Sequence, residues 1–179
     1  MFSILNSPDI YVRQFKTKPT RNQKRCKKLF EMIDDAEVEF QYNHFLSFDN
    51  FEDFEYNCFI SDFGFALLTK IPLFAQSFFK RKSEDIYWLS FFYIKPEFRG
   101  KGYGHYLFDI VSNKISTFYF TVNQQNQYAL DFYKHLGCID AKFPKSFTNQ
   151  LPDGLIYLKK AIWRKFLQKL KVVAISNLC

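Results

Sequence analysis

A strand-like apolar run, a loop rich in glycine and a helix-like segment follow one another over residues 86–115. This order constrains the fold more than any other feature of the chain. The apolar run covers residues 86–94, and the loop after it contains Gly100, Gly102 and Gly104, three of the six glycines of the chain. The helix-like segment repeats apolar residues at helical spacing: Tyr106, Leu107, Ile110, Val111 and Ile115. The pattern predicts a strand, a tight glycine turn and a helix.

Glycine turns at the N-terminus of a helix bind phosphate oxygens, because their backbone amides are left uncovered. Arg99 and Lys101 lie beside these glycines and would add positive charge. Two familiar phosphate loops are excluded by spacing. None of the three glycines is followed by the Lys-Ser/Thr pair of a Walker loop, and a dinucleotide fingerprint would need Gly or Ala where Leu107 stands. From the glycines alone, a turn without a ligand remains an equally good interpretation.

A second segment, residues 126–137, has the pattern of a short amphipathic helix. Asn126 is a favourable N-cap, and Gly137 supplies the C-cap. Between them, apolar residues recur at positions i, i+3, i+4 and i+7, namely Ala129, Phe132, Tyr133 and Leu136. A strand-like run over residues 118–122 precedes it. Taken alone, this segment would be an ordinary core helix with a tyrosine on its buried side.

The two segments together resemble the GNAT superfamily of N-acetyltransferases. That family carries Arg/Gln-x-x-Gly-x-Gly/Ala after a strand ending in Val/Ile-x-Pro, here residues 99–104 after residues 94–96. After one helix and one strand it carries Asn-x-x-Ala-x-x-Phe-Tyr-x-x-x-Gly, which residues 126–137 match at every named position. The close resemblance covers residues 86–138. It implies an α/β GNAT fold: a central mixed, mostly antiparallel sheet with splayed parallel central strands, flanked by helices.

The resemblance also implies a co-substrate and a set of site residues. Acetyl-CoA would be bound by the loop amides, by the end of the central strand and by Asn126. The cofactor-binding residues would be Phe92, Tyr93, Ile94, Arg99, Gly100, Lys101, Gly102, Tyr103, Gly104, His105 and Asn126. An amine would attack the thioester directly, a backbone amide near Ile94 would stabilise the oxyanion, and Tyr133 would protonate the leaving thiolate. The alternative for Tyr133 is a core residue with a satisfied hydroxyl.

The catalytic base of many family members is missing. The alternating positions of the central strand are Trp88, Ser90 and Phe92, and the later strand ends Thr121-Val122-Asn123. Glu84 and Asp85 lie near the start of the central strand and would act only through water, while loop acids of no catalytic role are the simpler interpretation. His105 is interpreted as a residue of the first helical turn and not as a base, and His44 and His135 have no supporting context. An acceptor amine that is already partly neutral would need no dedicated base.

Composition favours one compact domain over residues 1–160. The four cysteines of the 179-residue chain have no paired spacing, which argues against a disulfide framework and against a metal site. No signal pattern or membrane-spanning run is visible. We therefore expect a soluble, cytoplasmic protein.

The net charge of +7 is concentrated at the C-terminus. Six cations and no acid follow residue 158, which leaves +1 for residues 1–158. Residues 161–179 are expected to form a basic amphipathic extension. It would pack on the domain or on a second copy of the chain in a homodimer, or it would bind an anionic membrane, an acidic partner or nucleic acid.

Weaker patterns place the remaining elements. Strands are expected at residues 10–15, 55–60, 65–73 and 154–162, the middle two forming an antiparallel hairpin. Thr20 and Gln23 have the spacing of a capping box before a helix that buries Cys26, Leu29, Phe30 and Ile33. Residues 139–147 fit a strand poorly.

The function expected from this resemblance is acetyl-CoA-dependent N-acetyl transfer to a primary amine. The acceptor stays open among a small-molecule amine, a peptide N-terminus, a lysine and an aminoacyl-tRNA. The alternative is a catalytically silent module of the same fold that binds CoA or an anionic partner.

Overall fold

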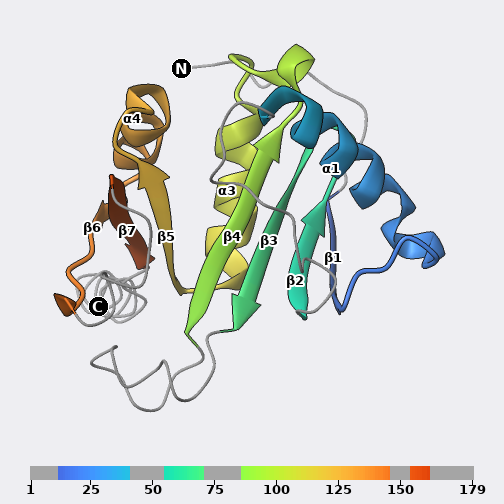
Figure 1. Ribbon diagram of the computed structural model, residues 1–179, viewed down its shortest axis with the longest axis horizontal. Helices are drawn as coiled ribbons and strands as arrows, with labels where there is room; N and C mark the ends of the chain where they lie inside the picture. Colours follow the sequence, from blue (N-terminus) through green and yellow to red (C-terminus); the bar gives the residue numbers. More distant parts are fainter. Residues whose placement is uncertain (1–11, 41–54, 71–85, 146–153, 162–179) are drawn as a thin grey trace, which may run out of the picture. The chain divides into compact units, whose positions relative to one another are not determined.

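The computed structural model describes residues 12–40, 55–70, 86–145 and 154–161 (Figure 1). Two compact units divide the chain. The first comprises residues 1–70 and 88–111, and the second comprises residues 71–87 and 112–179. The expected single domain over residues 1–160 stays a prediction. The basic extension, Glu84, Asp85 and His44 lie outside the described residues, apart from Ala161 at the start of the extension.

The first unit contains four strands in the order β1-β2-β3-β4. Their bounds are β1 (Arg13–Thr17), β2 (Tyr56–Ile60), β3 (Gly64–Lys70) and β4 (Tyr87–Ile94). β1 and β2 pair antiparallel, as do β2 and β3, with Phe15 opposite Cys58 and Cys58 opposite Leu67. The predicted hairpin is therefore confirmed over residues 55–70, and its last three residues, 71–73, lie outside the described residues.

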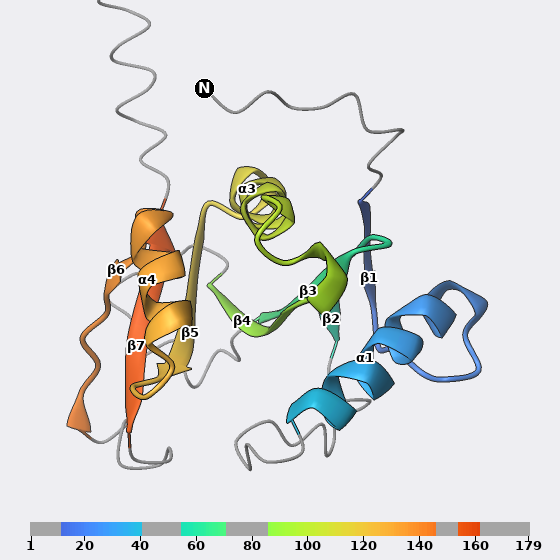
Figure 2. The same ribbon diagram turned by 90° about the horizontal axis from the view of Figure 1, so that it is seen from above.

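Helices α1 (Lys27–Phe40) and α3 (Tyr103–Lys114) lie on opposite faces of these strands, as Figure 2 shows. Alternation along each strand explains why both faces are apolar. Phe65 and Leu67 of β3 join the core cluster of α1, while Phe92 of β4 packs edge-on against Phe108 of α3. The predicted buried face of the first helix is confirmed, because Cys26, Leu29, Phe30 and Ile33 are all buried.

The predicted capping box before α1 is wrong. A 3-10 turn (Lys24–Cys26) precedes the helix, and its N-cap, Gln23, makes no side-chain capping hydrogen bond. The Gln23 side chain instead donates to Lys18 O and accepts from Thr17 Oγ1, at 3.0 and 3.1 Å. Contacts to Thr17, the last residue of β1, and to Lys18 thus replace the capping interaction.

The β2–β3 turn approaches the end of β4 so closely that Gly64 has no room for a side chain. A Cβ there would lie far inside van der Waals contact with the Tyr93 carbonyl oxygen, 2.9 Å from Ile94 Cδ1 and 3.1 Å from Ile94 Cα. The backbone oxygen of Tyr93 cannot move without disturbing the strand.

We expect Gly64→Ala to lower the free energy of unfolding by about 2–3 kcal/mol, as overpacking does in a dense core. Urea unfolding would measure the loss. Asp62→Ala is the control in the same turn: its exposed carboxylate pairs with Lys28, and it should cost no more than about 1 kcal/mol. Equal midpoints for Gly64→Ala and the wild type would contradict this close approach.

The second unit contains β5 (Thr117–Asn123), α4 (Gln127–His135), β6 (Ile139–Asp140) and β7 (Leu155–Ala161). The strand order is β5-β7-β6, with antiparallel pairing throughout and Phe120 opposite Leu158. The last predicted strand corresponds to β7. In the described part of the segment, residues 139–145, strand structure is limited to the two residues of β6, in keeping with its poor pattern.

Helix α4 forms as its sequence predicts. Asn126 caps it, with Oδ1 accepting from Ala129 N at 3.0 Å. After the last residue, Gly137 adopts a φ of 75°, and Cys138 N donates to Tyr133 O at 3.0 Å. This is the left-handed ending that glycine favours.

Within the described ranges, none of the helices is long and apolar enough to cross a bilayer. The same ranges hold no group of three or more His, Cys, Asp or Glu residues able to bind a metal ion.

Candidate functional site

The glycine loop joins β4 to α3 in the first unit. After Ile94 the chain makes a 3-10 turn (Pro96–Phe98), and Gly100 and Gly102 then adopt φ angles of 69° and 86°. L side chains rarely adopt this left-handed region, which explains glycine at both positions. Among the described residues, a Cβ at either position would meet nothing within 4 Å. The glycines are therefore required by backbone conformation and leave open space in front of the loop.

The loop ends at the N-terminus of α3, whose first turn closes where Tyr106 N donates to Gly102 O at 3.0 Å. The amides of Tyr103 and Gly104 precede this hydrogen bond and belong to the group that a helix leaves without intrahelical partners. Together with the helix dipole, they favour an anion at this end. Lys101 is exposed beside them.

The β2–β3 turn packs against the glycine loop. Lys95 N donates to Phe63 O at 3.0 Å, and the Phe63 ring lies 4.8 Å from the ring of Tyr103 and 6.3 Å from that of Phe98. Phe98 and Tyr103 flank the glycines and stack edge to face at 5.2 Å. Both ends of the loop are thus packed on a common aromatic support.

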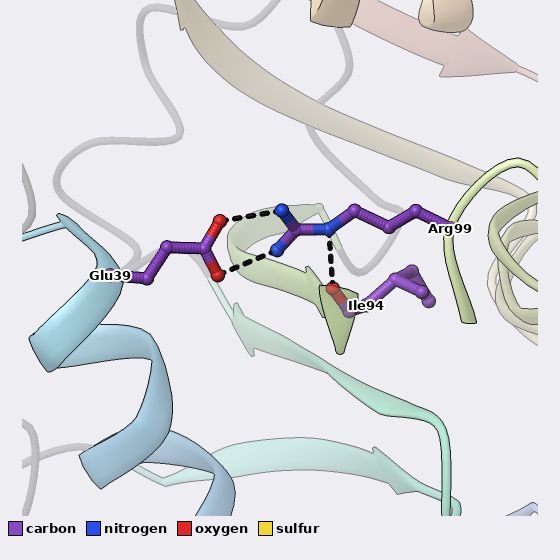
Figure 3. Close-up of polar contacts among 3 residues, drawn as sticks. All are labelled: Glu39, Ile94 and Arg99. Atoms are coloured by element: carbon purple, nitrogen blue, oxygen red, sulfur yellow. Dashed lines mark hydrogen bonds and ion pairs between the residues drawn. The ribbon is translucent and has the colours of Figure 1, made fainter. Parts of the chain in front are cut away.

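Arg99, the first residue of the glycine motif, is engaged by α1 and by β4 (Figure 3). Its Nε donates to Ile94 O at 2.8 Å, and its two terminal nitrogens donate to the two carboxylate oxygens of Glu39 at 2.5 and 2.7 Å. The guanidinium carbon lies 5.6 Å from the centre of the Tyr93 ring. Sequence reasoning missed Glu39, because 60 residues separate it from Arg99 and no local pattern links them.

The charges of this network depend on one another. The pKa of the Glu39 carboxyl is lowered, chiefly by the hydrogen bonds from Arg99, against the opposing effect of burial. Burial, followed by the Glu39 charge, raises the pKa of Tyr93 to about 12. Glu39 is therefore ionised at neutral pH and balances the Arg99 charge. The expected contact of Arg99 with CoA stays a prediction.

The three predicted residues of β4 differ in what their side chains contact. The Phe92 ring packs against Phe108, and Tyr93 is buried in the α1 core. Ile94 is also buried, and its carbonyl accepts from Arg99. With these side chains packed, a role for this strand end in binding CoA would depend on backbone groups.

The predicted residues of the second unit lie on α4. Asn126 is exposed at the N-terminus, and Tyr133 lies seven residues further along, about 10 Å away along the axis and on the same side. The Tyr133 ring is 4.5 Å from that of Phe120 and 5.1 Å from that of Phe132. Burial, followed by the nearby Cys138, raises the pKa of Tyr133. The phenol therefore stays protonated at neutral pH.

Among the alternating positions of β4, Ser90 carries the polar side chain. Ser90 Oγ lies 3.1 Å from Thr69 Oγ1, a pairing of hydroxyls between strands. His105 and His135 are exposed on α3 and α4. Their place on the helices adds no support for a role as base.

Comparison with family models agrees with this geometry. Residues 77–149 match the model of the acetyltransferase (GNAT) domain. The matched residues make up less than half of the chain, and they resemble a GNAT acetyltransferase domain. Acetyltransferases of that family take their acyl group from acetyl-CoA. A comparison with curated protein sequences gave no match.

Several solved structures of acetyltransferases share the fold of this chain. A GNAT-family acetyltransferase from Staphylococcus aureus is 14% identical, with a TM-score of 0.55 and coverage of 85% of this chain and 98% of that one. A putative GNAT-family acetyltransferase from Bacteroides thetaiotaomicron is 13% identical (TM-score 0.53, 91% and 93% covered). NAA60 from Arabidopsis thaliana, solved with a bisubstrate analogue, is 12% identical (TM-score 0.52, 72% and 91% covered). The predicted α/β GNAT fold is confirmed.

Proposed function

We propose that this chain is an acyltransferase that moves an acetyl group from acetyl-CoA directly to a primary amine. The glycine loop carries the proposal. It combines two left-handed glycines, open space in front of them and the N-terminus of a helix. This combination suits a pyrophosphate, which brings several oxygens to one place and carries negative charge.

Each proposed residue has one task in the transfer. Amides from Gly100 to His105 hold the pyrophosphate, with Lys101 adding charge, and the backbone of residues 92–94 pairs with the pantetheine arm. Asn126 contacts CoA from α4. The neutral amine attacks the thioester carbonyl, and a backbone amide near Ile94 stabilises the oxyanion. As the carbon–sulfur bond breaks, Tyr133 donates its proton to the thiolate, and the proton lost by the amine goes to water.

The packing of its ring supports Tyr133 as the acid, because contacts with Phe120 and Phe132 fix the position of the phenol. Without a base on β4, the amine must arrive neutral. The rate should therefore rise with pH until the amine itself is deprotonated.

An acceptor screen tests the proposal. Small amines, peptides with free N-termini, lysine-containing peptides and an aminoacyl-tRNA would be incubated with acetyl-CoA, following both free thiol and acetylated product. We expect one class to give equal amounts of both, with a rate that rises with pH.

Gly102→Asp is the matched control, because it is designed to remove acetyl-CoA from the loop. If the wild type binds CoA but no amine raises thiol release above hydrolysis, the chain is instead a silent CoA-binding module.

A further inference from the structure

Glu39 lies at a position where an acidic side chain does not stabilise the helix. It is the penultimate residue of α1, and a carboxylate near a helix C-terminus is disfavoured by the helix dipole. The last turn of α1 contains no basic residue to offset it. The carboxylate is matched instead by Arg99, from a loop 60 residues further along the chain. This pairing, rather than the helix, accounts for an acid at this position.

The ion pair between Glu39 and Arg99 has a more restrictive geometry than an ordinary surface ion pair. Both carboxylate oxygens are bound by separate guanidinium nitrogens, and the two side chains are only 29% and 38% exposed. Bidentate pairs of this kind fix orientation as well as distance. With Nε on Ile94 O, the guanidinium joins the last turn of α1, the end of β4 and the start of the glycine loop (Figure 3).

A glycine loop needs such a restraint if its amides are to converge on an anion. Gly100 and Gly102 have more conformational freedom than other residues, so an unrestrained loop loses more entropy when a ligand orders it. Phe63 fixes the far end of the loop through Tyr103. Arg99 fixes the near end. Restraint before binding raises affinity because the ordering cost is already met in the free protein.

We propose that Glu39 is a positioning residue for acetyl-CoA. The Glu39 carboxylate holds the Arg99 side chain in place, and Arg99 in turn fixes the backbone at the start of the glycine loop. In this arrangement, which we call the strut, Arg99 does not contact phosphate directly. The inference rests on the proposed function, in which the loop binds the pyrophosphate of CoA.

The strut and a direct contact of Arg99 with phosphate predict opposite changes in CoA affinity for Glu39→Gln. Calorimetry with CoA would compare the wild type with Glu39→Gln, Arg99→Gln, Arg99→Lys and the double Gln variant. A strut predicts that Glu39→Gln weakens binding about tenfold. Arg99→Lys keeps the charge but loses the two guanidinium nitrogens that bind Glu39, so it should weaken CoA binding as much as Arg99→Gln does. The double Gln variant should weaken CoA binding no further. A direct contact predicts the reverse: Glu39→Gln frees the guanidinium and tightens binding, while Arg99→Lys is mild.

Glu31→Gln is the matched control on α1. Its carboxylate, two turns before Glu39, pairs with Lys27 at 3.9 Å on the exposed surface, so CoA affinity should not change. Glu39→Asp keeps the charge but shortens the reach by one methylene. It provides the same comparison if Glu39→Gln does not fold.

A second measurement needs no ligand. Hydrogen exchange of the amides at residues 100–105 should be faster in Glu39→Gln than in the wild type or Glu31→Gln. Unchanged exchange, or CoA binding that is unchanged or tighter in Glu39→Gln, would overturn the strut. Absence of CoA binding by the wild type would instead refute the proposed function, so the two failures are distinguishable.

Discussion

Tyr133→Phe is expected to lower kcat about 100-fold or more, while the affinity for acetyl-CoA stays nearly unchanged. The substitution removes the hydroxyl and keeps the ring, which lies 4.5 Å from Phe120 and 5.1 Å from Phe132. A positioned general acid contributes on the order of 100-fold to 10,000-fold. Without it, the thiolate must leave unprotonated or take a proton from water. Single-turnover kinetics would place the loss in the chemical step.

Tyr128→Phe is the control on the same helix. Tyr128 is 76% exposed, so loss of its hydroxyl should change neither kcat nor the unfolding midpoint. A fall of less than about threefold in Tyr133→Phe, where chemistry limits turnover, would exclude Tyr133 as the acid. The tyrosine would then be a core residue of α4, the alternative that its sequence pattern leaves open.

Local patterns predicted the parts of the fold that local interactions form. Helix α4 has its capping residue, its apolar repeat and its terminal glycine within twelve positions, and the structure shows all three. The hairpin of β2 and β3 and the strand–loop–helix at residues 86–115 were also predicted, because their signals are continuous in sequence. Glycine at positions 100 and 102 was informative for the same reason, since a left-handed backbone is a requirement of single residues.

Contacts distant in sequence could not be predicted. Nothing near Glu39 distinguishes it from the other acids of α1, and only the fold brings it to Arg99. The support that Phe63 gives to Tyr103 is equally hidden, because a phenylalanine in a hairpin turn has no characteristic partner. The capping box failed for a related reason: β1, which the pattern does not include, offers Gln23 competing hydrogen bonds. The sequence therefore predicted the position of the glycine loop but not the distant residues that fix its conformation.

Gly102→Asp is expected to weaken CoA binding at least 100-fold while the protein remains folded. Since a Cβ at Gly102 meets nothing within 4 Å among the described residues, the side chain would extend into the space in front of the loop. Its negative charge would then face the pyrophosphate. Two unit charges about 4 Å apart repel by about 4 kcal/mol at an effective dielectric constant of about 20, so a 100-fold loss is a conservative expectation.

Gly102→Asn separates this charge effect from backbone strain. Position 102 has a φ of 86°, so any side chain is strained there, and Asn and Asp tolerate the left-handed region better than other side chains do. Both variants should lose a similar free energy of unfolding, about 1–2 kcal/mol. Their CoA affinities should differ widely, because only Asp carries the charge, and the difference should shrink as salt screens it. If calorimetry gave the two variants the same affinity at low salt, no phosphate could lie in front of Gly102. The open space at the N-terminus of α3 would then be only a tight turn between a strand and a helix.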